Sequence, residues 1–320
     1  MYLKLFIAFT LSLSLILILM PSLINYLKSI SFNQTVNEYA LQEYKEKAKT
    51  PTMGGILFVL IPVIVTLIID IEAYTDLDTF IVMMAYVAYG LIGFLDDYLI
   101  VVRRNNDGLK AKYKFILQLI LAIVFFVLYV QNNDLAIVIP IIKLDLYLGP
   151  LYPLLIFIMF TGSSNAVNLT DGMDGLAAGC MVFALIPFII FSVLYKNTAL
   201  SILLVSILGS LIGYLKYNIT PAKVYMGDTG SLALGALLAA TAMVLKSEVL
   251  LIIVGGVFIW ETLCVIIQIS SVKLRGKRVF RYTPIHYSFV LDGMSEKSVV
   301  KSFWLLSAIC CVVGLVIGLI

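Results

Sequence analysis

The sequence predicts an all-α integral membrane protein that forms one polytopic domain over residues 1–320, and three observations support this class. Hydrophobic residues make up 62% of the chain and charged residues only 13%, which is too apolar for a soluble domain with a solvated surface. Apolar stretches of about 17 to 25 residues, each long enough to cross about 30 Å of hydrocarbon as a helix, recur from end to end. Lysine and arginine are concentrated in alternate loops between these stretches.

About ten transmembrane helices are predicted, because polar or Gly/Pro-rich breaks divide the apolar sequence into ten parts. The predicted helices span residues 3–26, 53–70, 79–98, 114–130, 151–164, 174–195, 199–216, 230–245, 248–270 and 300–319. The first has no small-x-small cleavage site, so we expect it to be a membrane span and not a signal peptide. Residues 143–149 alternate polar and apolar side chains with period two, which predicts a short extracellular β-hairpin before the fifth helix.

The basic residues predict which loops face the cytoplasm, because cytoplasmic loops are enriched in lysine and arginine. Only four of the 22 basic residues belong to the opposite side, namely Lys4, Lys143, Lys196 and Lys246. With ten helices, this distribution places both termini outside. The loops near residues 45, 110 and 275 are then cytoplasmic.

Five acidic residues occupy the predicted cytoplasmic ends of helices, and they are Asp96, Asp97, Asp171, Asp174 and Asp228. Carboxylates next to hydrocarbon are costly unless they are paired or bound to a cation. Magnesium suits them best, because it takes oxygen ligands, keeps some of its waters and bridges protein carboxylates to substrate phosphates. The sequence therefore predicts a magnesium site that receives a diphosphate.

Spacing supports part of this prediction. Asp171 and Asp174 are three residues apart and would share one face if the sixth helix began there, whereas adjacent Asp96 and Asp97 point about 100° apart on a helix. The alternative interpretation is structural, with Asp171 as an N-cap and Asp228 as a turn residue between glycines. We favour the metal site because all the acidic motifs fall on one side of the membrane.

Two further segments have both a structural and a functional interpretation. Thr50 and Pro51 are predicted to be the N-cap and first residue of the second helix, whose N-terminus is also suited to bind an anionic group near Lys49. His286 is the only histidine and lies in the long basic loop between the ninth and tenth helices. The basic residues of that loop fit membrane topology, anionic lipid or phosphate equally well.

Taken in order, these segments resemble the bacterial phospho-N-acetylmuramoyl-pentapeptide transferases, a family of the polyprenyl-phosphate N-acetylhexosamine-1-phosphate transferase superfamily, of the glycosyltransferase 4 type. The most specific segments are residues 50–55, 93–98, 164–175, 226–231 and 284–286. The resemblance covers nearly the whole chain. It implies ten helices with both termini outside, in agreement with the distribution of the basic residues.

The resemblance also implies a reaction and its partners. Undecaprenyl phosphate would attack the sugar-linked phosphate of UDP-N-acetylmuramoyl-pentapeptide, releasing UMP and forming the first lipid-linked precursor of peptidoglycan. Mg²⁺ would be the cofactor, and the protein would lie in the bacterial cell membrane with its active site facing the cytoplasm. Membrane lipid surrounds such an enzyme, a homodimer is expected, and no nucleic acid is expected as a partner.

The resemblance assigns roles to individual residues. Asp96, Asp97 and His286 are the expected catalytic residues, with the choice of base between the two aspartates left open. Asp171 and Asp228 are the expected metal ligands. The residues expected to bind substrate or border its pocket are Lys49, Thr52, Asn165, Asn168, Asp174, Gln268 and Glu261. Direct attack and a two-step route through an aspartyl-phosphate both remain open.

The chain departs from the family pattern at two places. Tyr287 and Ser288 stand where the family usually has its second and third consecutive histidines, and Ile100 stands where it commonly has a lysine. A phosphate contact is therefore expected to be missing. Arg103, Arg104 and Tyr287 are the candidates to replace it.

Two other functions are compatible with part of the sequence. A sister enzyme of the superfamily would use the same metal site on UDP-N-acetylglucosamine, but residues 284–286 and 293–296 favour the muramoyl-pentapeptide enzyme. A secondary transporter would also have about ten spans, but its polar or broken-helix sites should lie near the bilayer midplane. Here the carboxylates are predicted at the cytoplasmic ends of helices, which favours the enzyme.

Overall fold

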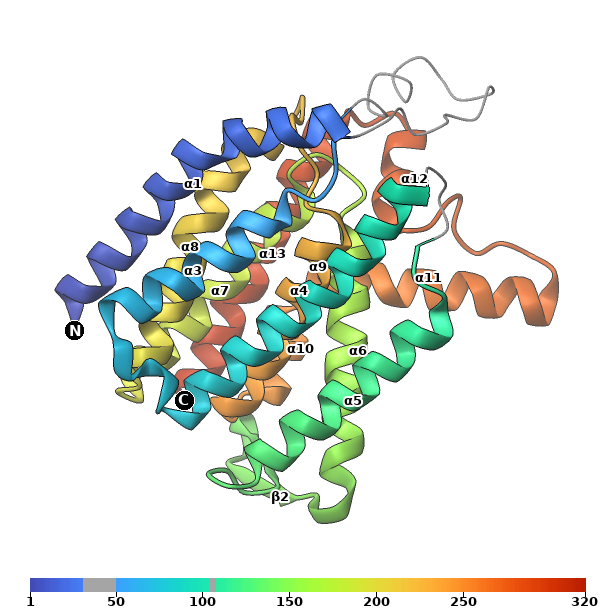
Figure 1. Ribbon diagram of the computed structural model, residues 1–320. Coiled ribbons are helices and arrows are strands. Elements are labelled where there is room, and N and C mark those ends of the chain that lie inside the picture. Colours follow the sequence, from blue (N-terminus) through green and yellow to red (C-terminus); the bar gives the residue numbers. More distant parts are fainter. Residues whose placement is uncertain (31–49, 104–107) are drawn as a thin grey trace.

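The computed structural model describes residues 1–30, 50–103 and 108–320, which form a helical bundle with one small sheet (Figure 1). Within these ranges, nine helices are long and apolar enough to cross a membrane. They are α1 (Tyr2–Ile30), α4 (Leu77–Arg103), α5 (Ala111–Tyr129), α6 (Tyr152–Thr170), α7 (Leu176–Leu194), α8 (Thr198–Asn218), α9 (Gly227–Val244), α11 (Gly256–Arg275) and α13 (Glu296–Leu319). The predicted multi-pass helical membrane class is confirmed.

Shorter α-helices complete the described bundle, namely α3 (Gly55–Ile69), α10 (Glu248–Val254) and α12 (Ile285–Leu291). The 15 residues of α3 rise only about 22 Å, less than the thickness of the hydrocarbon core, so a tenth span stays a prediction. The helix predicted over residues 248–270 is divided between α10 and α11. The division falls at Gly255 and Gly256, because paired glycines lack the side chains that stiffen a helix.

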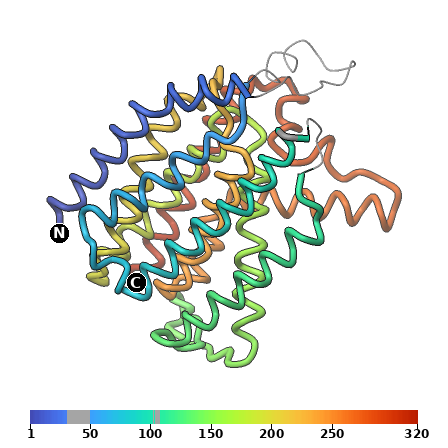
Figure 2. The backbone as a smooth tube through the Cα atoms, viewed as in Figure 1, coloured from blue at the N-terminus to red at the C-terminus, as the bar shows by residue number. Residues whose placement is uncertain are grey.

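Helix α9 lies at the centre of the bundle, where α3, α4, α6 and α7 pack around it (Figures 1 and 2). Every residue from Thr229 to Val244 is buried. The sequence of α9 explains this position, because glycine, alanine, serine and threonine allow neighbouring backbones to approach closely within a membrane. The helix therefore acts as the support against which the other helices are placed.

Two glycines bring the flanking helices into direct backbone contact with α9. A Cβ on Gly93 of α4 would collide with the backbone of Asp228, and a Cβ on Gly235 of α9 would collide with the backbone of Ser163 and Ser164 in α6. Backbone cannot move aside as a flexible side chain can. These contacts bring the acidic ends of α4, α6 and α9 together.

A two-stranded hairpin is formed by β1 (Ala136–Ile139) and β2 (Leu144–Tyr147), which are antiparallel with Ala136 opposite Tyr147. Only β2 lies within the predicted residues 143–149, because β1 is a continuous apolar run without the polar alternation on which the prediction depends. The hairpin lies at the same end of the bundle as both chain termini, which we call the hairpin end (Figure 1). The opposite end, which we call the carboxylate end, carries Asp96, Asp171 and Asp228. The side of the membrane that each end faces stays a prediction.

Candidate active site

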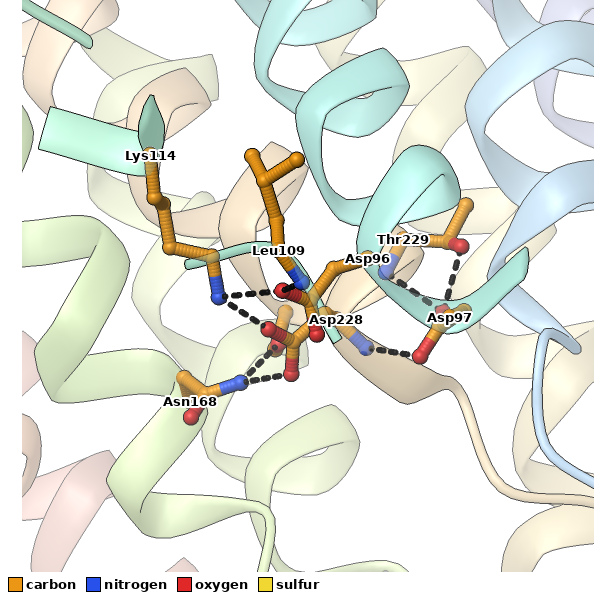
Figure 3. Close-up of polar contacts among 8 residues, drawn as sticks. Asp96, Asp97, Leu109, Lys114, Asn168, Asp228 and Thr229 are labelled. Carbon is orange, nitrogen blue, oxygen red and sulfur yellow. Dashed lines mark hydrogen bonds and ion pairs between the residues drawn. The ribbon is translucent and has the colours of Figure 1, made fainter. Parts of the chain in front are cut away.

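Four elements place a cluster of polar side chains at the carboxylate end (Figure 3). Lys114, in the first turn of α5, lies with its Nζ 2.6 Å from Asp228 Oδ2 and 3.3 Å from Asp96 Oδ1. Asn168, near the end of α6, donates from Nδ2 to Asp228 Oδ1 at 2.6 Å. One cation and one amide thus hold two carboxylates from helices that are distant in the sequence.

The adjacent residues Asp96 and Asp97 meet different partners, as their predicted separation around the helix requires. Asp96 Oδ1 accepts from the backbone N–H of Leu109 at 2.9 Å and faces Lys114. Asp97 accepts from the N–H groups of Asp228 at 3.1 Å and Thr229 at 2.9 Å, and from the Thr229 hydroxyl at 2.6 Å. Asp97 therefore caps the N-terminus of α9 from the neighbouring helix.

The cap depends on Gly93, which lies one turn before Asp97 on the same face of α4. Because Gly93 has no side chain, α4 reaches the backbone of Asp228 and brings the Asp97 carboxylate to the first N–H groups of α9. A carboxylate is favourable there, because the first N–H groups of a helix lack partners within it and the helix dipole attracts negative charge. Asp97 thereby holds the first turn of α9, which carries Asp228, in place.

Asp171 and Asp174 lie in a turn, because α6 ends at Thr170 and α7 begins only at Leu176. The prediction that the sixth helix begins at residue 174 and carries both carboxylates on one face is wrong. Gly175 adopts a positive φ of 77°, a left-handed conformation that ends the turn and that glycine adopts without steric cost. We call residues 171–175 the aspartate turn.

The aspartate turn is held by several elements at once. Asp174 Oδ2 accepts from the N–H of Ala222 at 3.0 Å. The N–H of Gly175 donates to Asn218 Oδ1 at 3.1 Å, and its carbonyl accepts from the indole of Trp304 at 3.0 Å. The second half of the turn is consequently fixed by α8, α13 and the segment that leads into α9.

Asp171 differs from the other carboxylates, because its side chain makes no hydrogen bond or ion pair within the described parts of the chain. Burial, together with the nearby carboxylates of Asp228, Asp97 and Asp174, raises the pKa of the Asp171 carboxyl well above its usual value. A cation beside this group would favour its ionised form. The chemistry of the position suits a ligand of a divalent cation.

No group of three or more His, Cys, Asp or Glu side chains is arranged to hold a metal ion within residues 1–30, 50–103 and 108–320. Asp171 and Asp228 together offer two carboxylates. Magnesium tolerates such a sparse protein shell, because it usually retains waters and binds one or two carboxylates plus substrate phosphates. The residues present therefore fit magnesium better than an ion that requires a complete protein cage.

Helix α12 carries His286, whose side chain is fully buried against Glu261 of α11. The distance from His286 Nδ1 to Glu261 Oε1 is 3.0 Å, and Glu261 Oε2 accepts from the N–H of Ile285 at 2.8 Å. The hydroxyl of Tyr287 donates to the carbonyl of Gly172 at 2.9 Å. One carboxylate thus fixes α12, and α12 lies against the aspartate turn.

Gln268 and Asn165, both predicted to bind substrate, bond to the backbone. Gln268 Oε1 accepts from the N–H groups of Val279 at 2.9 Å and Phe280 at 3.0 Å, while its Nε2 donates to the Phe280 carbonyl at 3.0 Å. Asn165 is exposed on α6 and donates to the Thr161 carbonyl at 2.7 Å. Gln268 shapes the basic loop, and the substrate roles of both residues stay predictions.

Thr52 lies beside the cluster, because a Cβ on Gly227 would contact its Oγ1 as well as the Asp97 carboxylate. Its position at the start of α9 is compatible with the predicted contact to substrate. Lys49, the other residue of this segment predicted to bind substrate, lies outside the described residues.

The predicted cap formed by Thr50 and Pro51 is wrong, because α3 begins only at Gly55. The N–H groups of Gly54 and Gly55 donate instead to the carbonyls of Tyr225 at 2.8 Å and Met226 at 3.1 Å. Backbone from another segment therefore replaces the expected side-chain cap. This pairing joins the residues around Thr52 to the segment that leads into Asp228.

Sequence reasoning did not predict the roles of two members of the site. Lys114 belongs by sequence to the basic loop residues that set topology, although it provides the cation beside Asp96 and Asp228. Glu261 is expected from sequence only to border the pocket, but it orients His286. Its presence inside an apolar stretch is a signal, because a carboxylate within the membrane needs a partner.

Of the two arginines that could replace the lysine missing at Ile100, Arg103 is exposed and Arg104 lies outside the described residues. The cation of the cluster comes instead from the next helix, through Lys114. Tyr287, the third candidate, contacts the aspartate turn through Gly172.

Comparison of the sequence with known proteins identifies the family of the chain. The model of glycosyl transferase family 4 matches residues 79–246, and signature 1 of the phospho-N-acetylmuramoyl-pentapeptide-transferases matches residues 47–59. A phospho-N-acetylmuramoyl-pentapeptide-transferase of Staphylococcus carnosus is 44% identical over 307 residues, which are 94% of this chain and 95% of the relative. One from Staphylococcus aureus is 43% identical over 312 residues, which are 96% of this chain and 97% of the relative.

The chain belongs to the phospho-N-acetylmuramoyl-pentapeptide-transferase family. The predicted resemblance is thereby confirmed. The region matched by the glycosyl transferase family 4 model includes Asp96, Lys114, Asp171 and Asp228, so the polar cluster and the aspartate turn both lie within the part of the chain that defines the family.

Proposed function

We propose that this protein transfers phospho-N-acetylmuramoyl-pentapeptide from its UDP-linked donor to undecaprenyl phosphate, releasing UMP and forming the first lipid-linked precursor of peptidoglycan. The observation that carries the proposal is the Asp171 carboxylate, which has no bonding partner among the described residues and whose pKa is raised by burial and by the nearby carboxylate of Asp228. The donor of the proposed reaction carries a diphosphate. A carboxylate without a partner is suited to bind a divalent cation that also binds this diphosphate.

The chemical step exchanges one phosphorus–oxygen bond for another. An oxygen of the lipid phosphate forms a bond to the sugar-linked phosphorus of the donor, and the bond from that phosphorus to UMP breaks. The ammonium group of Lys114 lies beside Asp96 and Asp228. From this position it would stabilise the negative charge that develops as the diphosphate bond breaks. Asn168 keeps the Asp228 carboxylate in a fixed orientation.

We assign the orientation or deprotonation of the lipid phosphate to Asp96. Both oxygens of Asp97 accept hydrogen bonds from the N-terminus of α9, so Asp97 supports the site through the helix. Asp96 Oδ2 makes no hydrogen bond to any described residue, and only Oδ1 is engaged by Leu109 and Lys114. The geometry therefore supports Asp96 as the group that meets the acceptor.

Asp171 and Asp228 would hold the magnesium ion. A bound magnesium ion would offset the negative charge of the diphosphate and of the departing UMP. The protein's contribution is to keep both carboxylates at one end of the bundle, through the Asp97 cap on α9 and the bonds that fix the aspartate turn.

An apolar cavity of about 350 Å³ supports a prenyl chain as part of the acceptor. It is lined by α6, α10 and α11, with Leu155 and Val167 among its walls. Asn168 follows Val167 on α6, so one helix borders both the cavity and the polar cluster. One ligand could then place its prenyl chain in the cavity and its phosphate at the polar cluster.

The distribution of basic residues supports a bacterial cell-membrane enzyme whose carboxylate end faces the cytoplasm, where the soluble UDP-linked donor is made available. The exposed Lys110, Lys112 and Arg278 lie at this end. Association into a homodimer belongs to the proposal through the family resemblance.

The test follows UMP release from the purified protein in detergent with undecaprenyl phosphate and magnesium. Separate reactions contain UDP-N-acetylmuramoyl-pentapeptide or UDP-N-acetylglucosamine as donor. We expect release with the pentapeptide donor alone and its loss with EDTA. Asp171→Asn should lower turnover at least about 100-fold, whereas Asp145→Asn, at an exposed position of the hairpin, should retain it.

Release with UDP-N-acetylglucosamine alone would assign the protein to the sister function within the superfamily. Absence of release with both donors would contradict the proposal. Unchanged turnover in Asp171→Asn would remove this residue from the metal site.

A further inference from the structure

Tyr287 stands where the family resemblance predicts a histidine, and its side chain contacts the aspartate turn. Its hydroxyl donates to the Gly172 carbonyl at 2.9 Å, joining α12 to the aspartate turn. A Cβ on Gly172 would collide with Nε2 of His286, so glycine at this position lets the side chains of α12 pack directly on the turn. The contact is between two tightly packed elements.

The position of Tyr287 is itself fixed. Its ring centroid lies 4.2 Å from that of His286 and 5.6 Å from that of Tyr282, which meets it edge-on at 83°. Glu261 anchors α12 through the N–H of Ile285 and through His286. The tyrosine hydroxyl is therefore presented to the turn by a rigid element.

The bond acts at the first half of the turn, where the N–H of Asp171 donates to the α6 carbonyls of Val167 at 3.1 Å and Asn168 at 3.2 Å. Asn218, Trp304 and Ala222 bond to Asp174 and Gly175, whereas the bond from Tyr287 is the one side-chain hydrogen bond to the backbone of Asp171 or Gly172 within the described parts of the chain. The Asp171 carboxylate has no bond of its own to any described residue. Its direction depends on the backbone next to it.

We propose that Tyr287 is a positioning residue that holds the Asp171–Gly172 peptide so that the Asp171 carboxylate faces the cation and diphosphate. The inference rests on the proposed function for the identity of the diphosphate. A tyrosine hydroxyl remains a donor throughout the neutral pH range, whereas a neutral histidine donates from only one of its two nitrogens. Tyr287 thus supplies a hydrogen-bond donor at a position where the family resemblance predicts a histidine.

The experiment compares three variants with the wild-type protein. Tyr287→Phe removes the hydroxyl and keeps the ring, and Tyr287→His restores the family residue with an N–H donor. Tyr282→Phe is the matched control, because it removes a hydroxyl from the exposed neighbouring ring. The measurements are kcat and KM for donor and acceptor, and binding of Mn²⁺ followed by electron paramagnetic resonance of the free ion. Mn²⁺ stands in for Mg²⁺ because both prefer carboxylate and water oxygens.

We expect Tyr287→Phe to lower kcat and to weaken Mn²⁺ binding, each by about fivefold, as fits the loss of one neutral hydrogen bond. The KM for undecaprenyl phosphate and the unfolding temperature should stay close to the wild-type values. Tyr287→His should recover most of both losses, and Tyr282→Phe should match the wild type. If the role of Tyr287 were purely structural, Tyr287→Phe would instead lower the unfolding temperature and would have no specific effect on Mn²⁺ binding.

Equal Mn²⁺ binding and equal kcat in Tyr287→Phe and wild type would overturn the inference, as would a wild type that binds no Mn²⁺. If Tyr287→Phe weakens Mn²⁺ binding but the wild type does not turn over the pentapeptide donor, the proposed function fails and the positioning role stands. The two conclusions are thereby separated by measurements on one set of proteins.

Discussion

Lys114 and Lys246 lie at opposite ends of the bundle and form ion pairs of the same length with different surroundings. Each ammonium lies 2.6 Å from an aspartate oxygen, on Asp228 for Lys114 and on Asp134 for Lys246. The Asp134 side chain is 71% exposed, whereas that of Asp228 is 23% exposed. Water screens the pair at Asp134, so its contribution to folding is expected to be small, and it screens the pair at Asp228 much less.

The partners of the two lysines also differ. Lys246 is surrounded by acceptors, because it also donates to the backbone carbonyls of Asp134 and Ala136 and lies over the rings of Tyr129 and Tyr152. Lys114 instead lies between two carboxylates, Asp228 and Asp96. At the hairpin end, Lys246 holds the loop at Asp134 and Ala136 in place. At the carboxylate end, Lys114 offsets the negative charge of Asp96 and Asp228. Equal distance therefore does not mean equal function.

The largest expected effect comes from replacing these lysines one at a time. Lys114→Met should lower the rate of UMP release by about 100-fold, because Asp96 and Asp228 lose the fixed cation between them. Lys246→Met should change turnover less than about twofold and the free energy of unfolding by at most about 1 kcal/mol. Steady-state UMP release and thermal unfolding in the same detergent measure both. Similar turnover in the two variants would contradict a catalytic role of Lys114 that Lys246 does not share.

An intermediate effect is expected from the buried tyrosines at the hairpin end. The Tyr152 hydroxyl donates to Glu248 Oε1 at 2.6 Å and lies 2.7 Å from the Tyr129 hydroxyl. Tyr152→Phe leaves these buried groups without that partner and should lower the free energy of unfolding by about 1–3 kcal/mol. Turnover below the unfolding temperature should remain near wild type. A selective loss of turnover would show that this end of the bundle also serves catalysis.

The smallest expected effect is the pH dependence of the exposed pair. The hydrogen bond from Lys246 lowers the pKa of the Asp134 carboxyl in the folded protein. The pair therefore stabilises the fold above the unfolded pKa of about 3.9, and this contribution is lost as the pH falls through the lower folded value. The loss should be about 0.2–1 kcal/mol, because Asp134 is exposed.

Unfolding of the wild type and of Asp134→Asn, measured from neutral to acidic pH, checks this effect. The two stability curves should approach each other as the pH falls, because the aspartate of the wild type loses its charge whereas the amide of the variant does not titrate. A difference between them that grows toward low pH would give the opposite sign and contradict the assignment.

The membrane class and most helix positions could be predicted from sequence, because long apolar stretches and the polar breaks between them are local properties. The helix predicted over residues 79–98 in this way extends from Leu77 to Arg103. The errors fall where glycine or backbone from another segment intervenes. Gly255 divides the predicted ninth helix, and the carbonyls of Tyr225 and Met226 replace the predicted cap at Thr50.

The carboxylates at the helix ends can be identified from sequence, because hydrocarbon excludes charge from most of the length of the spans between them. The role of each carboxylate depends on how the helices pack. Asp97 caps a helix that begins far later in the chain, Lys114 reaches Asp228, and Tyr287 reaches Gly172. Such bonds depend on the close approach of α4 and α6 to α9, which local sequence patterns do not specify. The same packing distinguishes Asp171, because every other described carboxylate of the cluster has a bonding partner on another segment. Asp171 is therefore the carboxylate that remains available to bind a cation.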